Sequence, residues 1–101
     1  SQNIKEYVLK RANGICELTN EEAPFFKSNG EPYLEVHHIN RLSDGGLDHP
    51  FNCAAISPNA HKEIHFGTNG KSLDQKLAKL VVQKEQTLDE EIALDEEIDF
   101  D

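Results

Sequence analysis

The stretch LEVHHIN, residues 34–40, is the part of the chain that decides its fold. It closes an apolar segment, 33–39, that has the composition of a β-strand. Downstream, Asn52 and the stretch HKEIH, residues 61–65, complete a pattern in which four of the five histidines fall in two short segments. Because histidine is both a common metal ligand and a base near neutral pH, these segments predict a metal-dependent active site.

Geometry assigns the four histidines to two roles, binding an ion and facing the substrate. Residues four apart share one face of a helix, so His61 and His65 can bind one ion together. Neighbouring strand residues point to opposite faces, so only one of His37 and His38 can complete the metal site while the other faces substrate. We expect a one-metal hydrolase, and nucleic acid is the substrate that suits it best.

Three imidazoles, from His37, His61 and His65, would leave an ion with open positions for water and a phosphate oxygen. Imidazole favours a transition metal over Mg, so we expect one ion of Zn, Ni, Co or Mn, with Mg as a weaker candidate. Glu35 lies two residues before His37 on the same strand face. It is predicted to hold the second ring nitrogen of His37.

His38 is then the predicted general base, because a neutral imidazole can take a proton from water at pH 7. Asn52 heads the expected second strand. Its amide is predicted to hydrogen-bond to backbone across the long loop and to hold His38 in position. The ion, on the other side of the phosphorus, would stabilise the developing charge and the leaving oxygen.

Secondary-structure signals place these residues in an α+β fold. An amphipathic helix is predicted over 2–12, and a second strand over 52–56 pairs antiparallel with the first. A short helix over 57–66 follows, since serine is a good N-cap and proline suits the first helical position. A further helix is predicted over 72–86, with Ser72 as its cap. We therefore expect a small ββα core with flanking N-terminal and C-terminal helices.

The net charge of −9 comes from one end of the chain. Residues 85–101 hold nine of the 19 acidic residues and no Lys or Arg, so 1–84 carries 10 acids against 10 basic residues. We expect a domain at 1–86, with its core at 11–67, and an acidic tail at 87–101. The tail is either a helical extension or disordered. It is interpreted, in order of preference, as a solvated linker, a partner-binding segment or a DNA mimic.

Length and composition fit one small domain. There is no apolar run long enough to span a bilayer and no signal-peptide pattern, so we expect a cytoplasmic protein without a membrane partner. Cys16 and Cys53 are predicted to be reduced thiols. The chain starts at Ser1 and contains no Met, so we expect a fragment of a longer protein.

One extended pattern joins the residues above: LEVHHI (34–39), LSDGG (42–46), Asp48, Pro50, Asn52 and PNAHKEIH (58–65). This pattern closely resembles the HNH nucleases, whose fold is the ββα-metal fold, and its flanks look most like the HNH domain of McrA-like, modification-dependent restriction enzymes. The resemblance implies a metal-dependent endonuclease that hydrolyses DNA phosphodiester bonds, as the cleavage domain of a restriction or defence protein. It also implies DNA and a separate DNA-reading domain or subunit as partners, and it leaves a homodimer open.

Carried over by position, the resemblance makes His38 the general base, Asn52 the middle Asn of the motif and His61 its last His. In the branch of the family with three histidine ligands, His37, His61 and His65 bind the metal. These assignments agree with those made from spacing alone.

The chain departs from the family at one corner. Many relatives hold a structural zinc with two Cys-x-x-Cys pairs, and the matching positions here are Cys16, Thr19, Ser57 and Ala60. One thiolate cannot make a tetrahedral zinc site, so we expect no structural zinc. Apolar packing is expected to replace it.

Three basic residues, Arg11, Arg41 and Lys62, are the predicted contacts to DNA phosphates, and Arg11 is preferred because an Arg precedes the motif in relatives. The alternative function is a catalytically inactive, metal-stabilised DNA-binding or interaction module, because the lost zinc ligands show that part of the pattern has eroded. A third hypothesis, a toxin nuclease held by an immunity protein, is not supported by the acidic tail or the missing signal.

Overall fold

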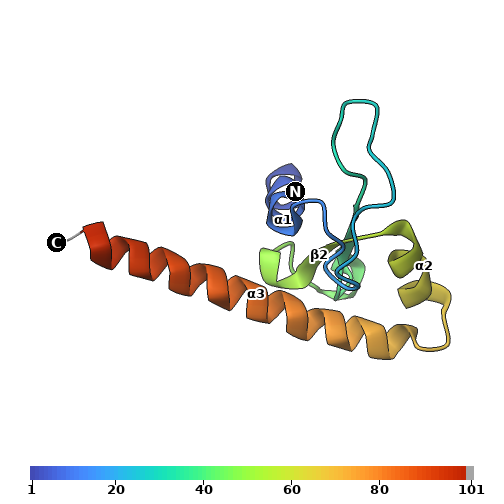
Figure 1. The fold of residues 1–101 in the computed structure, drawn as a ribbon. Coiled ribbons are helices and arrows are strands. Elements are labelled where there is room, and N and C mark those ends of the chain that lie inside the picture. The colour runs from blue at the N-terminus through green and yellow to red at the C-terminus, as the bar shows by residue number, and fades with distance from the viewer. Residues whose placement is uncertain (100–101) are drawn as a thin grey trace.

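The computed structural model describes residues 1–99 as a small body from which one long helix projects (Figure 1). Its elements are α1 (Gln2–Ala12), β1 (Glu35–His38), the 3₁₀ turns η1 (Leu42–Asp44) and η2 (Pro50–Asn52), β2 (Cys53–Ile56), α2 (Pro58–Phe66) and α3 (Gly70–Asp99). This order confirms the predicted α+β fold with its ββα core. Among the described residues, no helix is both long and apolar enough to cross a membrane.

The two strands form an antiparallel sheet, as predicted. The register pairs His37 with Ala54 and His38 with Cys53. β1 is shorter than the expected 33–39, and Asn52 lies in η2, immediately before β2, rather than in the strand. Asn52 therefore lies in a turn at the end of the sheet, where its carbonyl oxygen accepts a hydrogen bond from the Ile39 amide at 2.9 Å and its side chain bonds to loop backbone.

The first two helices lie close to their predicted ranges, and each follows a serine N-cap. The Ser1 hydroxyl accepts a hydrogen bond from the Ile4 amide at 3.3 Å, and α1 ends at Asn13 in the left-handed conformation, with φ 51°. The Ser57 hydroxyl accepts from the Ala60 amide at 3.2 Å at the start of α2. These caps satisfy amides that the first helical turn leaves unpaired.

The third helix, α3, is longer than predicted. It begins at Gly70, before the expected cap Ser72, and continues to Asp99. No Gly or Pro follows Gly70 in the sequence, and the Leu, Lys, Gln, Glu and Ala residues there are strong helix formers. Of the two alternatives for the acidic tail, the helical extension therefore applies as far as Asp99, and residues 100–101 lie outside the described residues.

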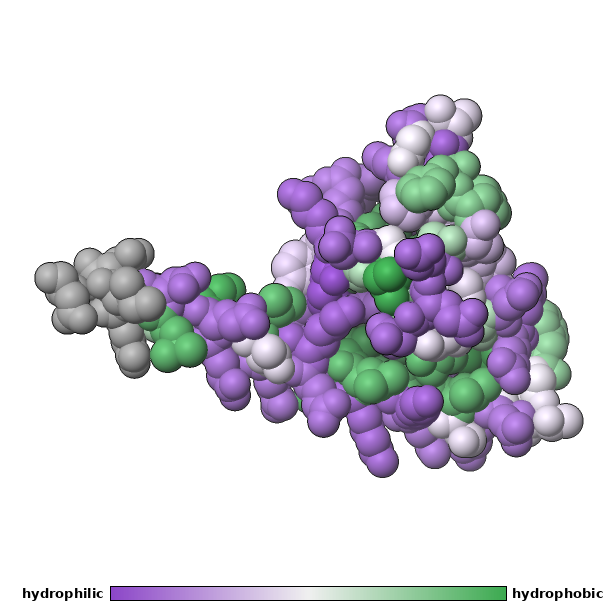
Figure 2. Space-filling view, viewed as in Figure 1, coloured by the Kyte–Doolittle hydropathy of each residue, from purple (hydrophilic) through white to green (hydrophobic). Residues whose placement is uncertain are grey.

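A tight turn after α2 brings the first half of α3 against the sheet and α1. A Cβ at Gly70 would lie 2.1 Å from the Ile64 carbonyl oxygen, so the close approach requires glycine. Leu77 and Val81 of α3 are fully buried in the core. The projecting half is mostly hydrophilic, with separate apolar patches (Figure 2). The helix is thus part of the core at one end and exposed at the other.

The corner at which the family resemblance places a structural zinc is closed by packing and one hydrogen bond. Leu18, Ile56 and Ala60 are buried there, as expected. The Cys16 sulfur accepts a hydrogen bond from the Ser57 amide at 3.3 Å. Although burial would raise it, hydrogen bonds from Thr19 and Ser57 lower the pKa of the Cys16 thiol. Cys16 therefore serves as a buried acceptor that joins the first loop to α2.

Arg11 is the centre of a buried ion cluster, and the prediction that it contacts a phosphate is wrong. Its side chain is 2% exposed and pairs with Glu17 at 2.8 Å and Glu85 at 3.1 Å. It also donates to the carbonyl oxygens of Pro50 and Cys53. All five guanidinium N–H groups are used in this way, so none is left for DNA.

Glu85 belongs to the core, although it begins the acidic run. It is 5% exposed, and both of its oxygens accept hydrogen bonds from the Tyr7 hydroxyl, at 2.9 and 3.0 Å. Its pair with Arg11 joins α3 to α1. The exposed part of the acidic run therefore starts after Glu85.

Candidate metal centre

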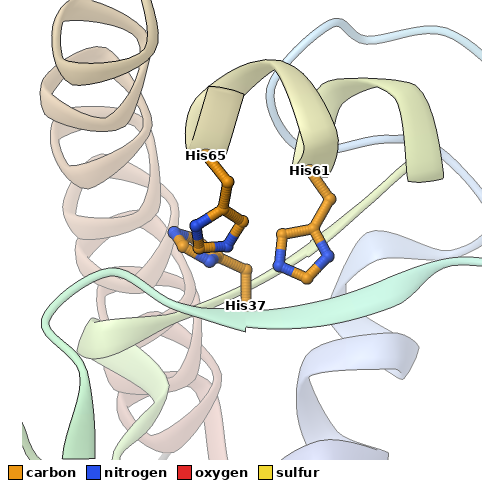
Figure 3. Close-up of side chains that lie close together, drawn as sticks. All are labelled: His37, His61 and His65. Carbon is orange, nitrogen blue, oxygen red and sulfur yellow. The ribbon is translucent and has the colours of Figure 1, made fainter. Parts of the chain in front are cut away.

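Three histidine rings converge between β1 and α2 (Figure 3). The ring centroids lie 5.1 Å apart for His37 and His61, 5.4 Å for His37 and His65, and 4.9 Å for His61 and His65. One ligand atom from each ring lies within 4.8 Å of the other two. The three side chains that the spacing argument grouped therefore lie close together in the structure.

The surroundings of this cluster fit a catalytic ion better than a closed structural one. His37 is buried, His61 is half-buried and His65 is exposed. An ion held by the three rings would be enclosed on one side and open on the other, as catalytic sites with three protein ligands are. Imidazole donors suit a transition metal such as Zn or Ni more than Mg.

Two carboxylates lie behind the ligands, and one of them was predicted for the wrong ring. Glu35 was expected to hold His37, but it accepts from His61 Nδ1 at 2.9 Å. The partner of His37 is Asp74 of α3, whose Oδ1 lies 2.9 Å from His37 Nε2. The error arose because Asp74 is 37 residues away, on a helix whose packing the sequence did not indicate.

Glu35 and Asp74 determine which ring nitrogens of His61 and His37 stay free to bind an ion. With Nδ1 of His61 engaged by Glu35, its Nε2 is free, and with Nε2 of His37 engaged by Asp74, its Nδ1 is free. The Tyr33 hydroxyl donates to the other oxygen of Glu35 at 2.8 Å. Hydrogen bonds from His61 and Tyr33 hold the pKa of Glu35 below its ordinary value, so Glu35 is a carboxylate that can accept from an imidazole N–H.

His38 stands apart from the three ligands and has its own carboxylate. Its Nε2 lies 3.1 Å from Asp48 Oδ1, and its side chain is 27% exposed. Asp48 belongs to the motif, but no role was predicted for it from the sequence. A ring held through Nε2 presents Nδ1 as its free nitrogen, which is the arrangement a general base requires.

Asn52 makes the backbone contacts expected of an orienting amide. Its Oδ1 accepts from the Asn40 amide at 2.9 Å. Its Nδ2 donates to the carbonyl oxygens of Asn40 at 2.8 Å and Leu47 at 2.7 Å. It therefore ties together both ends of the loop that follows His38.

The remaining two predicted phosphate contacts are exposed. Arg41 pairs with Asp44 at 3.0 Å on the surface. Lys62 lies on the outer side of α2, with its ammonium 5.6 Å from the centre of the Phe66 ring. Neither residue is held inside the body, so both stay available to a ligand approaching from solvent.

The chain is similar to known restriction enzymes, and no protein-family model matches it. The chain is 46% identical over 74 residues to the type IV methyl-directed restriction enzyme EcoKMcrA of Escherichia coli K12, which covers 73% of the chain and 27% of that protein. It superposes on the type IV phosphorothioation-dependent restriction endonuclease ScoMcrA with a TM-score of 0.72 and 33% identity, over 79% of the chain and 16% of ScoMcrA.

Sequence and structure converge on one class of domain, the HNH domain with the ββα-metal fold. Within that class, the chain is an McrA-like HNH domain, as the resemblance of its motif indicated. It spans only a small part of the length of either relative.

Proposed function

We propose that this domain is the cleavage module of a restriction enzyme and hydrolyses DNA phosphodiester bonds with one divalent metal ion. The observation that carries the proposal is the convergence of His37, His61 and His65 beside a separately held imidazole, His38. Both similar proteins are named as restriction enzymes, which supports a nuclease of a restriction system.

His37, His61 and His65 would hold the ion. When bound, it supplies a Lewis acid for the charge that develops on the phosphate. Glu35 and Asp74 orient two of the three ligand rings through their other nitrogens. The protein thus prepares the geometry of the metal site before the ion arrives.

His38 takes the proton from the attacking water through its free ring nitrogen. Asp48 holds the opposite nitrogen, so the ring cannot turn away from the substrate side. Asn52 fixes the loop that follows His38 and transfers no proton itself. The reaction therefore needs one base, one ion and one positioning amide from this chain.

DNA would be engaged by exposed basic side chains at this edge, with Arg41 and Lys62 as phosphate contacts. The body has no surplus of positive charge, so these contacts position the strand and do not supply strong affinity. A separate reading domain or subunit would supply recognition, since the relatives extend well beyond the matched segment. Cutting both strands would require two such domains, for example in a homodimer.

The alternative is a catalytically inactive, metal-stabilised DNA-binding or interaction module. The loss of three of the four zinc-knuckle cysteines, which leaves Cys16 alone, favours it. It predicts metal binding without cleavage of any DNA.

The test is plasmid cleavage by the full-length parent protein, on modified and unmodified DNA, with Mn, Co, Ni, Zn and Mg compared separately. We expect cleavage with at least one transition metal. His38→Ala should abolish cleavage and leave metal binding at the three histidines intact, whereas His61→Ala should abolish both cleavage and binding at that site. Cleavage that persists at the wild-type rate in His38→Ala would refute the assignment of the base.

A further inference from the structure

A second group of side chains that could bind a metal ion lies next to the three histidines and shares no residue with them. His38 of β1 and Cys53 of β2 face each other in the sheet register, and Asp48 comes from the loop between them. A nitrogen, an oxygen and a sulfur from these residues lie within 4.8 Å of one another. Residues directly opposite in an antiparallel pair have Cβ atoms about 5 Å apart, so the sheet itself keeps two of the donors together.

The chemistry of this group is different from that of the three histidines. An imidazole, a carboxylate and a thiolate are the ligand types that bind Zn, and the thiolate also favours other soft ions such as Cd. Mg and Mn prefer oxygen ligands. His38, Asp48 and Cys53 should therefore prefer Zn to Mn, whereas the three histidines are expected to bind either ion.

The group is protected but can still be reached. Cys53 is fully buried, and burial raises the pKa of its thiol, so the sulfur stays protonated until an ion displaces the proton. His38 and Asp48 are each more than a quarter exposed, at 27% and 28%, and they form the side open to solvent. The second oxygen of Asp48 contacts the Ser1 amino group, which leaves Oδ1 as the donor on the His38 side.

We propose that His38, Asp48 and Cys53 form a second site that binds a thiophilic divalent ion, Zn above all, and switches the nuclease off. Binding forms a metal–sulfur bond, breaks the S–H bond and releases the proton to solvent, with no change of oxidation state. The binding step stands on geometry and donor chemistry alone, and the inhibitory step rests on the proposed function.

Inhibition follows because a neutral imidazole ring has only one nitrogen lone pair to donate. A neutral imidazole has one nitrogen with a lone pair and one that carries a proton. If the lone pair of His38 is given to an ion, the other nitrogen holds the proton, and no position is left to accept one from water. The same side chain cannot be a ligand and a general base together.

Binding is tested by titrating the chain with Co²⁺ and following the near-ultraviolet charge-transfer absorption of thiolate-bound cobalt. We expect two ions per chain, of which one produces the thiolate absorption. Cys53→Ser should bind one ion without that absorption. Cys16→Ser is the matched control, because Cys16 is equally buried but lies outside the donor group, and it should keep both ions and the absorption.

Retention of the ion at His37, His61 and His65 shows that each variant is folded, because that site needs residues from both β1 and α2. A wild-type chain that binds one ion without thiolate absorption would overturn the second site. So would thiolate absorption that survives in Cys53→Ser and disappears in Cys16→Ser.

The inhibitory step is tested by plasmid cleavage in Mn with increasing Zn. We expect Zn to inhibit the wild type, and Cys53→Ser to need on the order of tenfold more Zn, as for loss of one group around a metal site. Equal inhibition of both proteins would overturn the switch. If no ion supports cleavage, the proposed function fails, while the cobalt titration still decides whether the second site exists.

Discussion

Asp74 is the residue whose role depends most on the folded structure. It is the carboxylate behind His37, and it comes from a helix outside the ββα core. A carboxylate in this position fixes the ring and raises its basicity as a ligand. The candidate metal centre therefore includes a contact from a segment that lies outside the HNH motif.

Replacing Asp74 by Asn should weaken metal binding by about 10- to 100-fold, because the amide keeps the size of the side chain but loses its charge. Isothermal titration with Zn or Co would measure the affinity. Asp95→Asn is the control, since it makes the same change at an exposed position of α3 and should bind metal as the wild type does. Unchanged affinity in Asp74→Asn would show that His37 does not depend on this contact.

Arg11 offers a second prediction at the scale of single residues. Arg11→Met should lower the free energy of unfolding by about 3–5 kcal/mol, because it leaves Glu17 and Glu85 as buried charges without their partner. Lys84 also pairs with Glu17, at 3.0 Å, but is 42% exposed. Lys84→Met should cost less than about 1 kcal/mol. Urea denaturation would measure both, and similar losses would contradict the structural role given to Arg11.

At the scale of elements, α3 is divided into a packed half and a free half. Leu77, Val81 and Glu85 are buried against the body, whereas Ile92 and Leu94 are more than half exposed. The stability of the domain should therefore depend on the helix up to the turn that carries Glu85, and little on the turns beyond it.

Truncation after Gln86 should change the free energy of unfolding by no more than about 1 kcal/mol, because the residues removed from the described helix contribute little buried surface. Truncation after Leu80 removes Val81 and Glu85 as well and should prevent stable folding. Circular dichroism during thermal unfolding would compare the two. A large loss from the shorter truncation would mean that the projecting half is part of the domain.

The elements also show what the sequence could and could not predict. The helix over 2–12 and the start of a helix at Ser57-Pro58 rest on local signals, and the structure confirms both. His61 and His65 share one face of α2, as their spacing predicted. Glu85 was placed in the predicted helix over 72–86 and counted with the acidic end of the chain, and no partner was predicted for it. Its role is set by Arg11, 74 residues earlier, and only the packing of α3 against α1 brings the two together.

At the scale of the whole molecule, buried carboxylates make the fold sensitive to acid. The Arg11 guanidinium and the Ala55 amide hold the pKa of Glu17 below its ordinary value of 4.5, against the effect of burial. A lowered carboxyl pKa contributes stability above the unfolded value, and this contribution is lost as the pH falls through the folded value. Stability should therefore fall as the pH drops below about 4.5.

Urea midpoints measured from pH 7 to pH 3 would check this. Glu17→Gln should be less stable at pH 7 and should lose less of its stability on acidification than the wild type. Glu90→Gln, at an exposed position of α3, should keep the wild-type slope. Equal slopes in all three proteins would place the acid sensitivity elsewhere.

The straight course of α3 sets a minimum separation within any larger assembly. At 1.5 Å per residue, the turns between Gln86 and Asp99 add about 20 Å of rod beyond the body. A rigid helix of this length fixes the distance between its two ends. In the proposed nuclease, the far end at Asp99 would lie about 37 Å from Asp74 and the candidate metal centre, or about three major-groove widths, so a group bound there would contact DNA to one side of the cleaved bond.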